Sequence, residues 1–387
     1  MAFQQLRRDE EEGNPQEQND DGIFRWTINL MDESDDRGDC STSSDVSSGN
    51  TSISVPQEMI DSFQRDGFAV FPEVISTNAV DALNDRLEDV LRGVYDRGRT
   101  PDKVPRLVKG HKPQPLREPE IPIPDTNDSP PPPPPDKTKQ KHNKTTAKKK
   151  KHGRTKRTIG PIGFSGNLQN VRVLQIINMH KADSLFRKLE TNPALANVVS
   201  QLAGWDHFGG ARLAQDQFWG KPPNAPPLVF HRDSPYFMFR PSEVVTVWIA
   251  LDDMDHDLGP LEYVVGSHKW GDGRIGSANQ FFQADTKSLL WSAAEKEGID
   301  PDTLDFVSMG GRLQSGGLSI HHGKIWHGSA KNSSATKPRR GLGLHFVPAS
   351  VRFTAEASKS RLWKPYVEGV EDPSQVELCE EDFPLSI

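Results

Sequence analysis

The stretch EVVTVWIAL, residues 243–251, is a short run rich in β-branched and aromatic side chains, which favour extended strands. Similar runs recur beyond Trp205, separated by Gly, Pro, Asp and Asn. They read ARLAQDQFW (211–219), PLEYVV (260–265), GGLSIHH (316–322) and GLGLHFV (341–347). Many short strands with turn residues between them predict a sandwich, a jelly roll or a barrel.

Helical patterns lie on the amino-terminal side of these strands. Between residues 54 and 100, two helices are expected around a short strand, because apolar residues recur at helical spacing after residue 76. Residues 182–190 and 193–205 predict two more helices, the second beginning at Pro193. We therefore expect an all-β core with flanking helices that cover its outside.

Two segments have compositions that do not suit a packed core. Residues 1–54 are acidic and polar and are expected to be disordered, although the island FRWTINLMD (24–32) is suited to docking onto a partner or onto the core. Residues 108–160 read as a disordered insertion that contains six consecutive prolines. Within it, residues 137–157 carry eleven Lys and Arg and no acid, so this basic loop either contacts nucleic acid or an acidic protein, or is simply solvated.

The expected compartment is intracellular, either cytoplasmic or nuclear. The two cysteines form no metal-binding or disulfide pattern, which suits a reducing environment. No apolar run is long enough to span a bilayer, and neither end offers a secretory, transit or peroxisomal signal.

The segment HRDSPYFMFRP, residues 231–241, places His231 and Asp233 two residues apart, so that an extended strand would turn both side chains to one face. A third ligand is offered by GGLSIHHGKIWHGSAKNSS (316–334), which contains His321, His322 and His327. Two histidines and one carboxylate form the facial triad of non-haem Fe(II) oxygenases, but zinc hydrolases use the same ligand types.

A pair of arginines opens the run after residue 338. Alternation along a strand would point either Arg339 or Arg340 into the core, where an unpaired guanidinium is costly. A carboxylate bound in two places removes that cost, which favours a dicarboxylic cosubstrate such as 2-oxoglutarate.

Five motifs occur in an order that resembles the phytanoyl-CoA dioxygenase family of Fe(II)- and 2-oxoglutarate-dependent oxygenases. They are GKPP (220–223), HRDSPYFMFRPS (231–242), the strand with Trp248, LGPLEYVVGSHKWG (258–271), and HGSAKNSS (327–334) with the arginine pair after it. The resemblance implies a double-stranded β-helix, a cupin-like jelly-roll barrel, with residues 55–107 as its helical part, 161–350 as its catalytic core and 351–387 as an extension.

The resemblance also implies roles for particular residues. His231, Asp233 and His327 would be the iron ligands, and Arg339 would hold the 2-oxoglutarate carboxylate. Arg340 remains an alternative, because the chain carries one extra residue before the pair. Three further expectations are a hydroxyl from Ser329, a pocket-lining or merely core role for Trp248, and a solvated strand-end position for Lys221. His321 and His322 are expected to pack or to support the ligands, and His345 to lie in the core.

The implied chemistry uses Fe(II), 2-oxoglutarate and O2, releases succinate and CO2, and hydroxylates a C–H bond. Asp233 supports hydroxylation, because related halogenases have a small residue in its place. A small acyl-CoA or lipid-like molecule is the expected substrate. Two alternatives remain: an oxygenase acting on protein or nucleic acid docked by the basic loop, and a non-catalytic binding protein on this fold. The oligomeric state is left open.

Overall fold

The computed structural model describes residues 26–28, 30, 53–104, 173–271 and 285–386. The acidic segment apart from residues 26–28 and 30, the insertion at 108–160 and its basic loop therefore lie outside the described residues. Among the residues that are described, no helix has both the length and the apolar composition required to cross a membrane.

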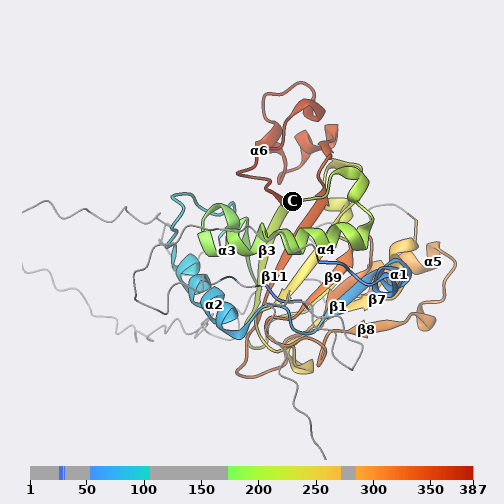
Figure 1. Cartoon of the computed structure of the whole chain (residues 1–387). Coiled ribbons are helices and arrows are strands. Elements are labelled where there is room, and N and C mark those ends of the chain that lie inside the picture. The colour runs from blue at the N-terminus through green and yellow to red at the C-terminus, as the bar shows by residue number, and fades with distance from the viewer. Residues whose placement is uncertain (1–25, 29, 31–52, 105–172, 272–284, 387) are drawn as a thin grey trace, which may run out of the picture.

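The strands form the centre of the molecule, α3 and α4 cross in front of them, and α5 and α6 lie at the right-hand edge and the top (Figure 1). The α-helices are α1 (Gln57–Asp66), α2 (Thr77–Arg92), α3 (Ser184–Glu190), α4 (Pro193–Ala203), α5 (Ser288–Lys296) and α6 (Lys364–Val367). The strands are β1 (Phe68–Phe71), β2 (Leu174–Ile177), β3 (Ala211–Lys221), β4 (Leu228–His231), β5 (Phe239–Arg240), β6 (Val245–Ala250), β7 (Leu261–Val264), β8 (Phe306–Ser308), β9 (Leu318–His322), β10 (His327–Ser329), β11 (Arg339–Pro348), β12 (Arg352–Phe353) and β13 (Leu385–Ser386). Each run of sequence that predicted a strand or helix contains one, so these expectations are confirmed.

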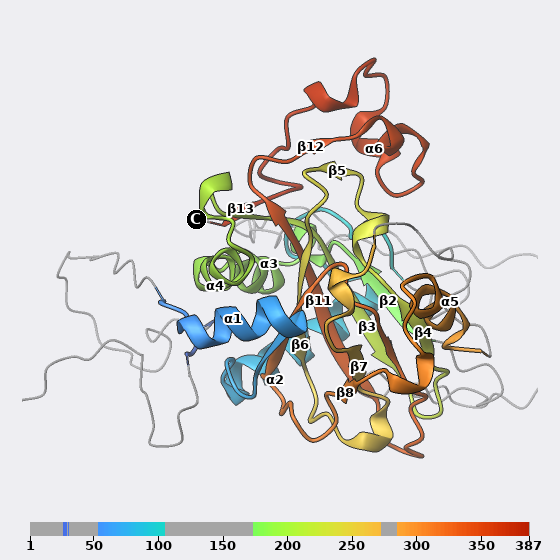
Figure 2. The ribbon, with the colours of Figure 1, turned by 90° about the vertical axis from the view of Figure 1, so that its right-hand side faces the viewer.

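Two antiparallel sheets form the β core. The larger has the order β1-β9-β6-β11-β3-β13, with β2 also paired to β3, and the smaller has the order β4-β10-β7-β8. Figure 2 shows α1, α3 and α4 on one side of the larger sheet, with β4, β7 and β8 on the other. This arrangement confirms the jelly-roll fold, although the described strand pairs leave two separate sheets instead of a closed barrel.

The helices begin and end where local chemistry directs them. The Ser76 hydroxyl accepts a hydrogen bond from the Ala79 N–H at the start of α2, and Gly93 ends that helix with a φ of 85°. A φ of this sign favours glycine, which has no Cβ to clash with the backbone. Between these caps, α2 buries an apolar face against the larger sheet, consisting of Ala79, Val80, Leu83, Leu87, Val90 and Leu91.

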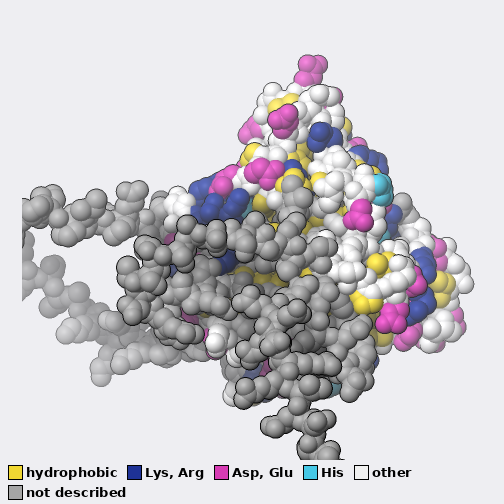
Figure 3. All heavy atoms as spheres, viewed as in Figure 1, with side chains coloured by type: hydrophobic (Ala, Val, Ile, Leu, Met, Phe, Trp, Pro, Cys, Tyr) yellow, Lys and Arg dark blue, Asp and Glu magenta, His cyan; other side chains and the backbone are white. Residues whose placement is uncertain are grey.

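Two segments outside the expected core also pack on it. Trp26, Ile28 and Leu30 are buried in the main hydrophobic cluster, and Ile28 forms a parallel bridge to Ile75. The island at residues 24–32 therefore lies against the core of its own chain wherever it is described. The extension after residue 350 adds β13 to the edge of the larger sheet. On the face drawn in Figure 3, acidic and basic side chains are mixed over this extension and over the surface just below it in the view.

Candidate metal and cosubstrate site

Antiparallel pairing brings the first and last predicted ligands together. His231 ends β4, His327 begins β10, and the two residues are direct cross-strand partners in the smaller sheet. Asp233 follows β4 by two residues and is buried beside them. The Asp233 Oδ1 atom lies 3.8 Å from His231 Nε2 and 3.7 Å from His327 Nε2. One ligand atom from each of the three residues falls within 4.8 Å of the others.

Backbone carbonyl groups fix the orientation of both imidazole rings. His231 Nδ1 lies 2.9 Å from the Val229 carbonyl oxygen, and His327 Nδ1 lies 3.1 Å from that of Ile325. Because a carbonyl oxygen only accepts, each Nδ1 carries the proton and each Nε2 presents its lone pair to the site. Burial, reinforced by the neighbouring histidine, lowers the pKa of His231 to about 4. Burial also lowers the pKa of His327 to about 4, so both rings are neutral at pH 7, as metal ligation requires.

The two oxygens of Asp233 have different surroundings. Oδ2 accepts a hydrogen bond from the Thr246 hydroxyl at 2.7 Å and lies 3.3 Å from His321 Nε2. Burial would raise the pKa of Asp233, but the facing histidines and the hydrogen bond from His321 lower this pKa well below its ordinary value. The carboxylate is therefore ionised. Its Oδ2 atom is held by Thr246 of β6 and His321 of β9, and its Oδ1 atom faces His231 and His327.

This donor set fits a divalent metal ion. Two neutral imidazole nitrogens and one ionised carboxylate oxygen lie close together on one side of the site. The Nδ1 atom of each histidine and the Oδ2 atom of Asp233 are held by hydrogen bonds to other protein groups. Three ligands on one side leave coordination positions open on the other, which is the requirement of a catalytic centre.

The two arginines of β11 point in opposite directions. Arg340 forms an ion pair with Asp252 at 2.5 Å on the outside of the sheet. Arg339 is fully buried, and its guanidinium lies 4.9 Å from the Trp248 ring. Arg339 Nη1 donates to the Gly259 carbonyl oxygen, but Nε and Nη2 have no hydrogen-bond partner among the described residues. Burial lowers the pKa of Arg339 to about 9, so it remains charged at pH 7 and offers an inward-facing fork to an anion.

The expectation that Lys221 is solvated at a strand end is wrong. Lys221 is completely buried, because β3 pairs with β11 and places it directly opposite Arg339. Its ammonium donates to the Ser329 hydroxyl at 2.8 Å and to the Ala330 carbonyl oxygen. Burial, followed by the charge of Arg339, lowers the pKa of Lys221 to about 6. Two buried basic groups, Lys221 and Arg339, thus lie opposite each other on paired strands, and this region is suited to a carboxylate.

His321 lies beside Asp233, in agreement with the sequence expectation of packing or support, but sequence reasoning missed Thr246. Thr246 is the polar residue in the otherwise apolar strand 245–250. Because it is two residues from Trp248, both side chains lie on the same face of the strand, and this spacing could have indicated that Thr246 faces the site. A second buried group, His180 with Glu190 and Asp216, left no local signal because its members come from three elements. His180 Nδ1 lies 2.5 Å from Asp216 Oδ2, so these two groups share a direct hydrogen bond. This second group lies outside the cavity that contains His231, Asp233 and His327.

Comparison with known proteins finds a family match. The family model for phytanoyl-CoA dioxygenase (PhyH) matches residues 63–341. A phytanoyl-CoA dioxygenase domain-containing protein 1 homolog of Caenorhabditis elegans is 28% identical over 175 residues, covering 44% of this chain and 56% of that protein. A phytanoyl-CoA dioxygenase of Arabidopsis thaliana is 25% identical over 190 residues, covering 48% of this chain and 62% of that protein. The matched region thus spans little more than half of these relatives.

Solved structures show the same fold. The non-haem alpha-ketoglutarate-dependent epimerase SnoN of nogalamycin biosynthesis superposes with a TM-score of 0.53 at 16% identity, covering 86% of this chain and 98% of that chain. The carbocyclase SnoK of the same biosynthesis gives 0.53 at 17% identity, covering 86% and 97%.

The two-sheet fold and the His–Asp–His group define a jelly-roll protein with a non-haem metal site. Because the family model covers more than half of its length, the chain belongs to the phytanoyl-CoA dioxygenase family. The cofactor of this class of domain is Fe(II), and its cosubstrates are 2-oxoglutarate and O2.

Proposed function

We propose that the protein is an Fe(II)- and 2-oxoglutarate-dependent dioxygenase that hydroxylates a C–H bond of a small, lipid-like acid and releases succinate and CO2. One observation carries the proposal. A single cavity of about 1180 Å³ is lined by His231, Asp233 and His327, by Arg339, and by residues of the carboxy-terminal extension. Cavities of this size hold small molecules and seldom macromolecules.

Each residue of the metal end has a definite task in this proposal. His231, Asp233 and His327 would hold Fe(II), and Arg339 would bind the far carboxylate of 2-oxoglutarate in the cavity. The ring of Trp248 keeps the Arg339 guanidinium in place by stacking. Bound iron, with 2-oxoglutarate and O2, supplies the oxidising power for the C–H bond, while the protein fixes positions and excludes water.

The wall of the cavity beyond the metal is largely apolar. Its apolar and aromatic members include Trp219, Leu228, Phe237, Leu261 and Leu362. These side chains come from β3, β4, the segment before β5, β7 and the extension, so they surround the space from several sides. A hydrocarbon body buried here gains about 25 cal/mol for each Å² of apolar surface removed from water. This lining favours a lipid-like substrate.

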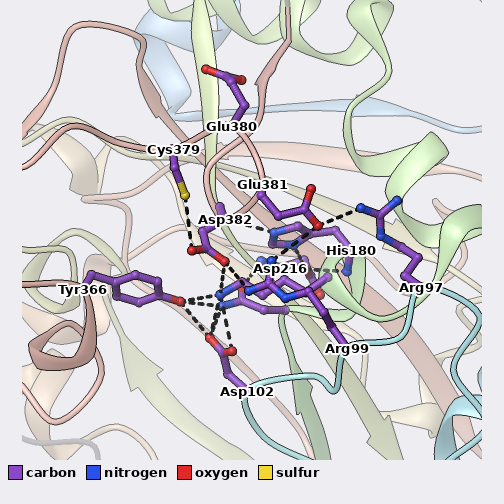
Figure 4. A network of polar contacts seen from close by, with 12 residues as sticks. Arg97, Arg99, Asp102, His180, Asp216, Tyr366, Cys379, Glu380, Glu381 and Asp382 are labelled. Carbon is purple, nitrogen blue, oxygen red and sulfur yellow. Dashed lines mark hydrogen bonds and ion pairs between the residues drawn. The ribbon is translucent and has the colours of Figure 1, made fainter. Parts of the chain in front are cut away.

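A polar network, several of whose residues line the cavity, holds the extension against the loop after α2 (Figure 4). Arg99 pairs with Asp382 at 2.7 Å, and Lys181 lies 3.1 Å from both Asp102 and Asp382. The Tyr366 hydroxyl donates to Asp102 at 2.8 Å. In this network, both Arg99 and Lys181 are already neutralised by acids of the chain.

Two other cations that line the cavity are not neutralised. Lys103 donates to the Gln175 side-chain oxygen at 2.5 Å, and neither Lys103 nor Arg361 pairs with an acid among the described residues. Partial burial, together with the charge of Arg361, lowers the pKa of Lys103, so these two cations lie close enough to repel each other. An anionic head group would remove this repulsion, which supports an acid as the substrate.

The test is succinate release by the full chain with Fe(II), 2-oxoglutarate and O2, first without substrate and then with octanoic acid, octanoyl-CoA or methyl octanoate. We expect slow release alone, stimulation by the two anionic compounds, and loss of all turnover in Asp233→Ala and His327→Ala. His207→Ala, which alters an exposed histidine in a 3-10 turn, serves as the matched control and should behave as wild type. No release in any condition would refute the proposed activity, and equal stimulation by the ester would refute the acidic substrate.

A further inference from the structure

A row of hydrogen-bonded glutamine side chains lines the cavity and leads from Lys103 to Gln215, the cross-strand partner of His345. It begins where the Lys103 ammonium donates to Gln175 Oε1 at 2.5 Å. Gln175 Nε2 then donates to Gln217 Oε1 at 2.7 Å, and Gln217 Nε2 donates to Gln215 Oε1 at 2.5 Å. Adjacent strands β2 and β3 carry the three glutamines, and all three line the cavity.

The direction of this row is fixed at its outer end. An ammonium group can only donate, so Gln175 must turn its oxygen to Lys103 and its NH2 group inward. Gln217 and Gln215 must follow the same orientation. The row therefore ends in the NH2 group of Gln215, which is 1% exposed and has no hydrogen-bond partner among the described residues. A buried donor without a partner costs about 1–3 kcal/mol, unless a ligand or a water accepts from it.

His345 presents the complementary group. The Thr246 hydroxyl donates its single proton to Asp233, so it must accept from His345 Nδ1, which lies 2.9 Å away. His345 Nδ1 therefore carries the ring proton, and Nε2 presents a lone pair. His345 is 5% exposed, and its Nε2 also has no hydrogen-bond partner among the described residues.

The two unpaired groups are neighbours. Gln215 on β3 and His345 on β11 are direct cross-strand partners, and both line the cavity that contains the iron ligands. Thr246 connects His345 to Asp233 by two hydrogen bonds, so the pair lies beside the metal site. One buried donor and one buried acceptor thus face the same space, with no partner in the described part of the chain.

We propose that Gln215 and His345 together bind a neutral group of the substrate that both accepts and donates a hydrogen bond, namely an alcohol or a carboxamide, beside the metal site. This inference rests on the proposed function and adds a second recognition element to the anionic head. A carboxylate or a ketone would accept from Gln215 but leave the His345 lone pair without a donor. A hydrocarbon would leave both groups unpaired.

The experiment measures binding without turnover. The full chain is loaded with Zn(II), a diamagnetic ion that does not support oxidation, and with 2-oxoglutarate. Saturation-transfer NMR titrations then compare cyclohexanol and cyclohexanecarboxamide with methylcyclohexane, which has a similar shape and no polar group. We expect the alcohol and the amide to bind about tenfold more tightly, which equals about 1.4 kcal/mol. Equal affinity for all three probes would overturn the proposal.

Variants assign the preference to this pair. Gln215→Met keeps the length of the side chain and removes its donors, so the preference for the alcohol and the amide should disappear. Gln314→Met, which alters an exposed glutamine of the loop before β9, is the matched control and should retain it. An equal loss in both variants would overturn the assignment to Gln215. His345→Phe tests the acceptor; should that variant fail to fold, Gln215→Met alone decides.

Succinate release by the wild-type protein without any probe separates this inference from the proposed function. Release with Fe(II) and 2-oxoglutarate, combined with equal affinity for the three probes, would refute the hydrogen-bonding pair and leave the oxygenase intact. No release and no 2-oxoglutarate binding would refute the oxygenase, and the inference with it.

Discussion

Replacing Lys221 with methionine should stabilise the metal-free protein, although it removes two hydrogen bonds. Lys221 is completely buried opposite Arg339, and among the described residues its side-chain amine donates to the Ser329 hydroxyl and the Ala330 carbonyl oxygen. Burial and the charge of Arg339 lower its pKa from 10.5 to about 6. Because the unfolded chain binds the Lys221 proton at pH 7 and the folded chain does not, folding at this pH must release it.

The cost follows from the size of the pKa change. Each unit between the working pH and the unfolded pKa of Lys221 costs about 1.4 kcal/mol, so the penalty is roughly 5 kcal/mol at pH 7 and roughly 2 kcal/mol at pH 9. Methionine keeps the apolar stem but loses two hydrogen bonds of about 1 kcal/mol each. We therefore expect Lys221→Met to raise the free energy of unfolding by about 3 kcal/mol at pH 7, and to lose this advantage by pH 9.

Urea unfolding with EDTA present, between pH 7 and pH 9, measures this difference. The wild-type free energy of unfolding should rise with pH relative to that of Lys221→Met. Lys331→Met, which alters an exposed lysine of the loop after β10, should follow the wild-type curve. The same substitution at Lys221 should weaken 2-oxoglutarate binding about 2- to 10-fold, because it removes a buried neutral donor opposite Arg339. Parallel curves for wild type and Lys221→Met would refute the argument that folding removes the proton from Lys221.

Four further outcomes are expected. Thr246→Val should lower the affinity for Fe(II) about 10- to 100-fold in anaerobic calorimetry, because it releases the carboxylate oxygen that the hydroxyl holds. Burial, and then the nearby Asp216 charge, raise the pKa of Glu190, so the wild-type free energy of unfolding should fall as pH rises above 4.5, by at most about 1.4 kcal/mol per pH unit. Glu190→Gln should reduce this fall. Gly341→Ala should destabilise the protein by about 1–3 kcal/mol in urea and weaken 2-oxoglutarate binding, because the new Cβ would lie 2.2 Å from Trp248. Deleting residues 108–160 should leave the KM for a small substrate unchanged in the succinate assay.

Each of these outcomes has a result that would contradict it. Thr246→Ser, which keeps the hydroxyl, should retain Fe(II) affinity, and an equal loss there would disprove the role of the hydrogen bond. A pH dependence of Glu190→Gln that matches wild type would show that Glu190 is not the titrating group. Gly343→Ala, whose Cβ would meet nothing closer than 3.8 Å, is the control for Gly341. A raised KM for small substrates in the deletion variant would show that the insertion serves the cavity.

The strands and the ligand group were accessible from the sequence because both depend on local periodicity. The run 243–251 is recognisable as a strand from its β-branched and aromatic residues, and an H-x-D pair on an extended segment shares a face whatever the rest of the chain does. Family motifs singled out His327 among three histidines as the predicted third ligand, and the structure places it opposite His231.

What the sequence did not reveal depends on pairing between distant segments. Lys221 reads as a strand-end lysine, and only its register with Arg339 on β11 shows that it is buried. Gln215 and Gln217 look like ordinary polar residues of an alternating strand. Their orientation follows from the pairing of β2 with β3 and from Lys103, which lies far away in sequence. Side-chain polarity is a local property, whereas the partners of a buried polar group are a property of the whole fold.

The carboxy-terminal extension contributes to the cavity wall but not to the group that would bind the metal, so selectivity and chemistry lie in different parts of the chain. The family match ends at residue 341, yet Leu362, Pro365 and Tyr366 from beyond it form part of the cavity wall. A recombination event or a designed graft confined to this terminal stretch would exchange the wall and leave the ligands of the metal unaltered. Related proteins with different carboxy-terminal extensions can therefore differ in the substrates they accept while they retain one reaction.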